Sequence, residues 1–185
     1  MTFRVVLDAC VLFPFSLRDT LLRLAERELY DVYWSDRILD EVTRNLVSQG
    51  FMDEAAAQRL EGFMRAAFDA AAVSTEAIDR LEPVMTNHPK DRHVLAAAVV
   101  ADAEAVVTSN LKDFRDEACE PCGIVAMHPD EFLMILQVKR PTVVLEVLTE
   151  QASDLKNPPW TLDELLDALA TVVPRFVGAV RQSMA

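Results

Sequence analysis

Glycine and long apolar runs are both scarce in this chain of 185 residues. Its four glycines are too few for a collagen-like or linker-like chain. No apolar run reaches the roughly 18 residues that a membrane-spanning helix needs. The first ten residues, MTFRVVLDAC, lack the long apolar core and the small-residue cleavage site of a signal peptide. We therefore expect a cytoplasmic protein that does not act at a membrane.

Cysteine is also rare, and its three copies are an odd number, too few for a disulfide framework. Cys119 and Cys122 form a single C-x2-C pair, to which His128 could add a third ligand. A structural zinc site needs about four ligands, so two ordinary thiols in a loop are the better interpretation.

Basic residues are in deficit. The chain has 18 Lys and Arg against 30 Asp and Glu, which gives a net charge of −12. This balance argues against broad, sequence-independent binding of nucleic acid, because such binding depends on cations that neutralise phosphates. It does not exclude an enzyme that meets phosphates through metal ions held by carboxylates.

Short apolar, β-branched runs alternate with helical patterns along most of the chain. This alternation indicates an α/β fold with a parallel five-stranded sheet flanked by helices. We predict strands near residues 3–7, 31–34, 71–74, 105–108 and 124–127, and helices near 16–29, 36–49, 53–70, 75–82, 91–102 and 129–138. Beyond Pro141 only helical patterns remain, near 141–152, 161–171 and 174–183. The chain is therefore divided into a domain of residues 1–140 and a C-terminal helical extension of residues 141–185.

Acidic residues lie where predicted strands end or helices face the sheet. Asp8 directly follows the first strand, inside an apolar stretch where an unpaired charge would be costly. Glu41 borders the apolar face of its helix, whereas Asp40 is about 100° away and is expected to be solvated. Asp91 opens a helix in line with its buried stripe. Each of these could instead be an ordinary turn, rim or cap residue.

The segment TSNLKDF at residues 108–114 follows another predicted strand. It offers hydroxyl, amide and carboxylate oxygens, although a simple turn before a cap is the alternative interpretation. Because the carboxyl ends of parallel strands meet at one edge, we expect these side chains to gather there: Asp8, Glu41, Asp91, Thr108, Asn110 and Asp113. Clustered carboxylates repel one another, and oxygen ligands suit Mg2+ or Mn2+. Such an ion could activate water against a phosphodiester.

Four blocks of the chain together resemble a PIN domain: LDAC at 7–10, ILDEVTRNL at 38–46, DRHVLAAAVVADAEAVVTSNLKDF at 91–114 and IVAMHPDEF at 124–132. The resemblance covers residues 3 to about 138 and implies a fold similar to that of 5′-nucleases. It implies metal-dependent ribonuclease activity, with catalytic and metal-binding roles for Asp8, Glu41, Asp91 and Asp113. Asn110 stands where many members have Asp, and Thr108 matches the hydroxyl beside the site.

Bacterial single-domain members of this family are commonly VapC-type toxins of type II toxin–antitoxin systems. The resemblance therefore predicts an endoribonuclease with an RNA substrate, Mg2+ or Mn2+ as cofactor and a cognate antitoxin protein as partner. It leaves a homodimer and DNA cleavage open, and it implies no role for the extension. The alternative is a non-catalytic PIN-fold binding module that acts through protein partners.

Several basic and histidine side chains lie close to the proposed site in sequence. His88 and His93 flank Asp91, where a surface or stacking role is favoured over proton transfer. Six cations are candidates for steering RNA, or are ordinary solvated charges: Arg18, Arg37, Lys90, Arg92, Lys112 and Arg115.

Overall fold

A four-stranded parallel sheet forms the centre of the computed structural model, which describes residues 3–184. The strand order is β2-β1-β3-β4, with bounds Arg4–Leu7 (β1), Asp31–Tyr33 (β2), Ala105–Val107 (β3) and Val125–Met127 (β4). The predicted α/β class and parallel pairing are confirmed. In the register, Val5 of β1 lies between Val32 of β2 and Ala105 of β3. Val5 to Leu7 and all of β3 are fully buried, as expected for strands covered on both faces.

The predicted fifth strand at 71–74 does not form. Within the described residues this segment makes a single parallel bridge, between Trp34 and Ala72. The backbone N–H of Trp34 donates to the oxygen of Ala71 at 3.0 Å, and that of Val73 donates to Trp34 at 2.9 Å. The segment then leaves the sheet at once, because the Ser74 hydroxyl accepts from Ala77 and caps the next helix. The prediction of five strands is therefore corrected to four.

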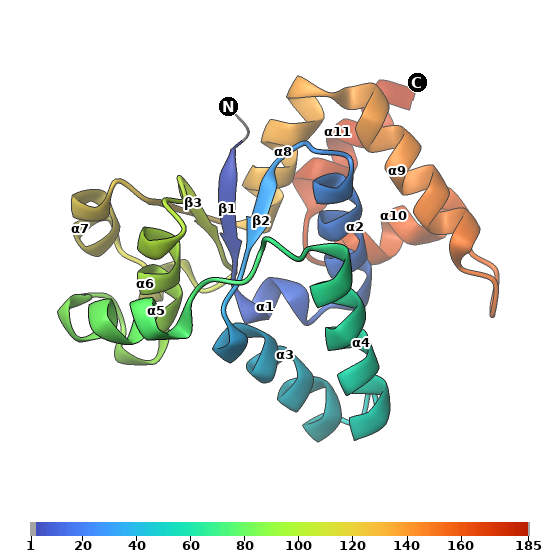
Figure 1. The fold of residues 1–185 in the computed structure, drawn as a ribbon. Helices are drawn as coiled ribbons and strands as arrows, with labels where there is room; N and C mark the ends of the chain where they lie inside the picture. Colours follow the sequence, from blue (N-terminus) through green and yellow to red (C-terminus); the bar gives the residue numbers. More distant parts are fainter. Residues whose placement is uncertain (1–2, 185) are drawn as a thin grey trace.

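Helices cover both faces of the sheet and its carboxyl edge (Figure 1). One side carries α5 (Thr75–Leu81), α6 (Arg92–Val100) and α7 (Asp116–Cys119). The other side carries α2 (Phe15–Glu26), α8 (Pro129–Lys139), α9 (Pro141–Asp154), α10 (Leu162–Ala170) and α11 (Pro174–Met184). Near the strand ends lie α1 (Ala9–Leu12), α3 (Asp36–Ser48) and α4 (Glu54–Ala67). Four short 3-10 helices are the remaining helical elements of the described residues: η1 (Glu82–Val84), η2 (Pro89–Asp91), η3 (Leu111–Asp113) and η4 (Glu120–Cys122).

The phase of α3 matters for the site because it decides which side chains face the strand ends. The Ser35 hydroxyl accepts from the N–H of Ile38 at 3.2 Å, which caps the first turn. Gly50 adopts a φ of 75°, a conformation that glycine enters without strain, and its N–H donates to Val47 at the end of the helix. With both ends fixed, Glu41 is half-buried and Asp40 is exposed, as the predicted phase requires.

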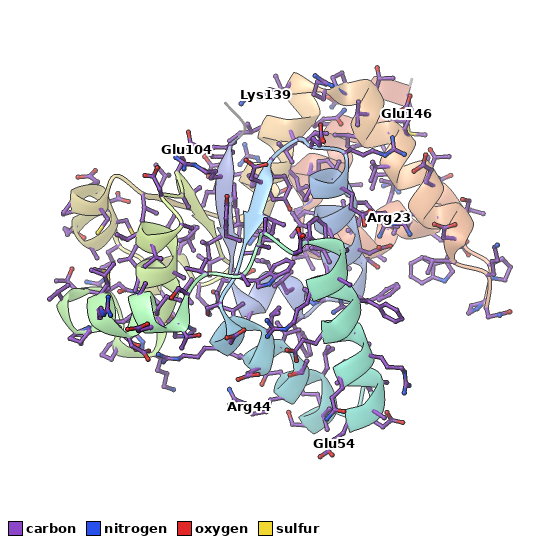
Figure 2. All side chains as sticks on the ribbon, viewed as in Figure 1. Arg23, Arg44, Glu54, Glu104, Lys139 and Glu146 are labelled. Carbon is purple, nitrogen blue, oxygen red and sulfur yellow. The ribbon has the colours of Figure 1, made fainter. Side chains whose placement is uncertain are left out.

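The C-terminal helices pack on the α/β body. Thr20 of α2 donates to the buried Gln151 side chain of α9 at 2.7 Å, and Gln151 donates to the backbone oxygen of Ser16 at 3.0 Å. Arg23, labelled on α2 in Figure 2, forms an ion pair with Asp154 at 2.9 Å. Between residues 3 and 184, no helix is both long and apolar enough to cross a membrane.

Candidate metal centre

Asp8 lies at the carboxyl end of β1 and is 4% exposed. Its Oδ1 accepts from the N–H of Ala9 at 2.7 Å, which starts α1, a helix that the sequence did not predict. Its Oδ2 accepts from the Thr108 hydroxyl at 2.7 Å and from the Cys10 thiol at 3.2 Å. Three donors therefore offset the cost of burying this carboxylate, and its capping role does not prevent it from facing the strand edge.

Thr108 links two of the predicted site residues. Its hydroxyl donates to Asp8 and accepts from the backbone N–H of Asn110 at 3.0 Å. The Asn110 side chain is exposed and lines the cavity at this edge. The hydroxyl thus fixes the position of the Asp8 carboxylate relative to the loop that follows β3.

His88, Asp91 and Asp113 form the compact donor group of the described residues. One ligand atom from each lies within 4.8 Å of the others, so this group could hold a metal ion. Two short turns present them, η2 for Asp91 and η3 for Asp113. The turns are joined by the N–H of His88, which donates to the backbone oxygen of Asp113 at 3.1 Å. Asp91 forms no side-chain cap on α6, which leaves its carboxylate facing the group.

Two residues of this region were not among the predicted ligands. His88 is exposed, but its Nδ1 lies 3.6 Å from Oδ2 of Asp91. The sequence feature that could have indicated His88 is HPKD at residues 88–91, in which Pro89 begins a turn that brings His88 back beside Asp91. The second is Cys10, whose pKa is raised to about 12 by burial and then by the charge of Asp8, so that it stays a protonated donor.

Electrostatic coupling joins the four predicted carboxylates. The pKa of Asp91 is raised to about 6, first by burial and then by the charges of Asp8 and Asp113, with a smaller contribution from Glu41. The pKa of Glu41 is also raised, by burial and by Asp8, while Arg44 opposes the shift. The oxygens of Asp8 and Glu41 lie outside the compact group, but the negative charges of both side chains raise the pKa of Asp91 within it. Concentrated negative charge with oxygen donors and one imidazole fits a hard divalent cation.

A cavity of about 810 Å3 opens over this cluster. Basic side chains line it together with the acids: Arg37, Arg44, Lys90 and Lys112. Arg37 is paired with Glu82. The other three make no ion pair with any of residues 3–184, and Figure 2 labels Arg44 projecting from α3 into solvent. Asp40 also lies at the rim of this cavity, exposed as predicted.

Arg18 is not at the site, contrary to the sequence prediction. Its side chain is buried and donates to the backbone oxygens of Leu12 at 2.8 Å and Phe13 at 3.2 Å. Those carbonyls belong to the end of α1, where the helix leaves acceptors unsatisfied. Arg18 therefore stabilises the C-terminal end of α1.

Comparison with known proteins assigns the family. A PIN-domain family model matches residues 4–112, which is more than half of the chain. The chain belongs to the PIN-domain family. A second model, the VapC50 C-terminal domain, matches residues 129–182 and so begins with α8, before the boundary at residue 140 that the sequence suggested. The PIN segment thus contains Asp8, Glu41 and Asp91 and ends just before Asp113.

A curated relative extends this comparison. The chain is 45% identical over 98 residues to a Mycobacterium tuberculosis protein named "Putative ribonuclease VapC50". The match covers 53% of this chain and 58% of that protein, so the chain spans little more than half of its relative. No solved structure matches the chain. Membership of the PIN family therefore rests on the sequence model, and the parallel sheet with acids at its carboxyl edge agrees with it.

Proposed function

We propose that this PIN-domain protein is a Mg2+- or Mn2+-dependent endoribonuclease and the toxin of a type II toxin–antitoxin pair. One observation carries the proposal: His88, Asp91 and Asp113 place ligand atoms within 4.8 Å of one another, where burial and then the charges of Asp8 and Asp113 raise the pKa of Asp91 to about 6. Such repulsion is maintained in proteins where a cation relieves it. The relative's name supports ribonuclease activity and a VapC-type role.

The residues of the cluster divide into ligands and supports. Asp91 and Asp113, with His88, would hold the ion, and Asp8 and Glu41 would add charge beside it. A divalent cation in such a site activates water and stabilises charge on the phosphate. Thr108 holds the Asp8 carboxylate in place. Lys90 and Lys112 lie where they would attract the RNA backbone to an otherwise acidic protein.

The proposed partner is a small antitoxin protein. Large apolar side chains that a partner could cover lie near α2 and α4: Phe15 is 51% exposed, Phe51 66% and Phe63 71%. A hollow of about 260 Å3 lies between Phe15 and Phe51. Co-expression with the product of a short neighbouring gene tests this partner. The expected result is a complex that survives gel filtration and has lost ribonuclease activity. A toxin whose activity is the same with and without that product would contradict the pairing.

Cleavage of labelled RNA by the purified protein tests the activity. We expect products with a 5′-phosphate and a 3′-hydroxyl in Mg2+ or Mn2+, and no cleavage in EDTA. Glu41→Gln should lower the rate at least about 100-fold, since metal affinity and activity fall steeply when acidic residues around an ion are lost. Glu26→Gln, the same change on the exposed end of α2, is the control and should retain full activity.

The same experiment separates the enzyme from a PIN-fold binding module. A folded wild-type protein that binds Mn2+ but cleaves no RNA would favour the binding module. Equal rates for Glu41→Gln and Glu26→Gln would show that the acidic cluster does not carry the activity.

A further inference from the structure

A second hollow, of about 770 Å3, adjoins the metal centre. The two share His88, Lys112 and Asp113, so the compact donor group forms the wall between them. This hollow is called here the Asn87 hollow, and its lining beyond that wall is Thr86, Asn87, Pro89, Arg92, Arg115, Glu117 and Ala118. Its volume is within the range of sites that bind small ligands, which run from about 300 to 1,000 Å3.

The cations of the Asn87 hollow are available to an anion. Arg92, Lys112 and Arg115 form no ion pair with another residue of the described chain. The net charge is −12, so acids that could have neutralised them are abundant. Apart from Asp113 in the shared wall, Glu117 is the acid that lines the hollow. Three unpaired cations around one concave surface attract phosphate groups.

Asn87 is the second and independent observation. The residue is only 6% exposed, yet neither its amide nitrogen nor its amide oxygen has a hydrogen-bond partner among the described residues. Buried polar groups are nearly always paired, so this amide calls for a partner. Its backbone oxygen is already used, accepting from Nε of Arg92 at 3.4 Å. The side chain therefore keeps an unpaired NH2 group and an unpaired carbonyl oxygen in a residue that lines the hollow, and both atoms are covered by their neighbours in this structure.

This combination matches one nucleotide of single-stranded RNA. An amide that offers a donor next to an acceptor complements the edge of a base, and unstacked RNA bases are read at such edges. Arginines bind the phosphate on the same unit. Pro89 and Ala118 give the hollow apolar wall for a base or ribose.

We propose that the Asn87 hollow is a nucleotide subsite that binds the RNA strand on one side of the cleaved bond. Arg92 and Arg115 hold a backbone phosphate there, and the Asn87 side chain turns toward the hollow so that its amide reads the base. The RNA strand continues over Asp91 and Asp113 into the cavity lined by Arg44 and Lys90. The assignment rests on the proposed ribonuclease function and adds to it the residues that select the sequence.

RNA binding, measured separately from cleavage, tests the subsite. The full-length protein is titrated in Mg2+ against fluorescent phosphorothioate hexanucleotides that vary at one position, and gels verify that the RNA stays intact. Arg115→Gln should weaken binding to every sequence by about tenfold and reduce the salt dependence by about 0.7 logarithmic units per decade, as loss of one phosphate contact does for single strands. Arg59→Gln is the matched control, because Arg59 is exposed on α4 away from both hollows, and it should bind within about twofold of wild type.

Asn87→Ala tests base reading. It should abolish the preference at one position, with about tenfold weaker binding of the favoured sequence and unchanged binding of the others. The melting temperature should not fall, because the amide has no partner to lose. An intact base preference in Asn87→Ala would overturn the assignment of Asn87, and a lower melting temperature with unchanged binding would show a structural role instead.

The outcomes distinguish the subsite from the proposed function. RNA cleavage that depends on Glu41, combined with equal RNA affinity of Arg115→Gln and Arg59→Gln, would overturn the subsite and leave the ribonuclease standing. Arg115-dependent RNA binding without any cleavage would support the subsite and overturn the ribonuclease. Loss of antitoxin capture in Arg115→Gln with unchanged RNA binding would show that the hollow binds protein, which also overturns the nucleotide assignment.

Discussion

Thr108 is a single hydroxyl on which two site residues depend. It donates to Asp8 at 2.7 Å and accepts from the N–H of Asn110 at 3.0 Å, in a fully buried position. Thr108→Val keeps the shape and removes both bonds. We expect the free energy of unfolding to fall by about 1–3 kcal/mol and RNA cleavage by about 10- to 100-fold. Thr108→Ser restores the hydroxyl and should recover most of the activity. Cleavage by Thr108→Val at the wild-type rate would contradict the positioning role.

Asp91 gives the metal-free protein a specific pH dependence. Its pKa is about 6 in the folded state against 3.8 for an ordinary Asp, so the folded state binds more protons between these values. Stability associated with this group is therefore present at acid pH and is lost as the pH rises through about 6. In EDTA at pH 8, Asp91→Asn should melt at a higher temperature than wild type. Because Asp91 is partly exposed, solvent screening limits the gain to about 1 kcal/mol.

The difference in melting temperature between Asp91→Asn and wild type should shrink towards pH 4, where both side chains are neutral. It should shrink or reverse when Mn2+ is added at pH 8, because the wild-type carboxylate then gains a partner. A melting temperature of Asp91→Asn below that of wild type at pH 8 in EDTA would show that Asp91 is stabilised by donors rather than destabilised by its acidic neighbours.

The positions of the candidate acids in the fold were easier to predict from the sequence than those of the neighbouring side chains, for a physical reason. Asp8 and Asp91 could be placed because a strand end and a helix phase are local features. His88 could not, because it reaches Asp91 through a turn whose closure depends on a hydrogen bond to Asp113, far along the chain. Arg18 was misplaced because its partners are backbone carbonyls of a short helix that has no signal of its own.

At the scale of elements, the longer helices were predicted closely because their ends carry local signals, whereas the four-residue helices α1 and α7 were missed. Ser35 and Gly50 define α3 without reference to the rest of the fold. The segment 71–74 looked like a strand because it is short and apolar, but a strand exists only if a partner pairs along its length. Here Ser74 begins a helix cap directly after one bridge. Strand number is thus decided by tertiary pairing, which the sequence pattern does not contain.

Asp130 is the main polar link between α8 and the last helix. It is buried, and its two carboxylate oxygens accept from the N–H groups of Phe176 at 2.8 Å and Arg175 at 3.2 Å. Asp130→Ala leaves the N–H of Phe176 buried without an acceptor at the start of α11 and removes the partner of the part-buried N–H of Arg175, so the free energy of unfolding should fall by about 1–3 kcal/mol in urea titration. Asp163→Ala, an exposed acid in the first turn of α10, should change it by about 0.5 kcal/mol or less. Equal effects would contradict the capping role.

Considered as a whole, the molecule has one apolar core that continues into the C-terminal helices. Val144 and Leu148 of α9, Leu165 of α10 and Phe176 of α11 are fully buried and belong to the same cluster as the strands. The predicted boundary at residue 140 followed a change of pattern along the chain, whereas packing in three dimensions does not change there. We propose that residues 141–185 are part of the folding unit rather than an appendage.

Truncation tests this proposal. A chain that ends at residue 140 lacks α9, α10 and α11, which pack on α2 and α8 and so help to bury the apolar sides of those two helices. We expect it to aggregate or to lose its cooperative thermal transition, in contrast to the full chain. A soluble 1–140 chain that melts cooperatively and binds Mn2+ as tightly as the full chain would show that the extension is separable.

The pairing of β1 with β3 also determines when the sheet can fold during protein synthesis. Val5 pairs with Ala105, so β1 leaves the ribosome well before the strand that must lie beside it exists. Asp8 emerges with β1, but Asp113 follows β3. The acidic cluster therefore cannot assemble until most of the chain up to Asp113 has been synthesised. Folding that waits for distant partners is slow. Pulling-force measurements on stalled nascent chains should detect a folding force only after β3 and η3 have cleared the exit tunnel, and until then the acids of the candidate metal site lie apart on an unfolded chain.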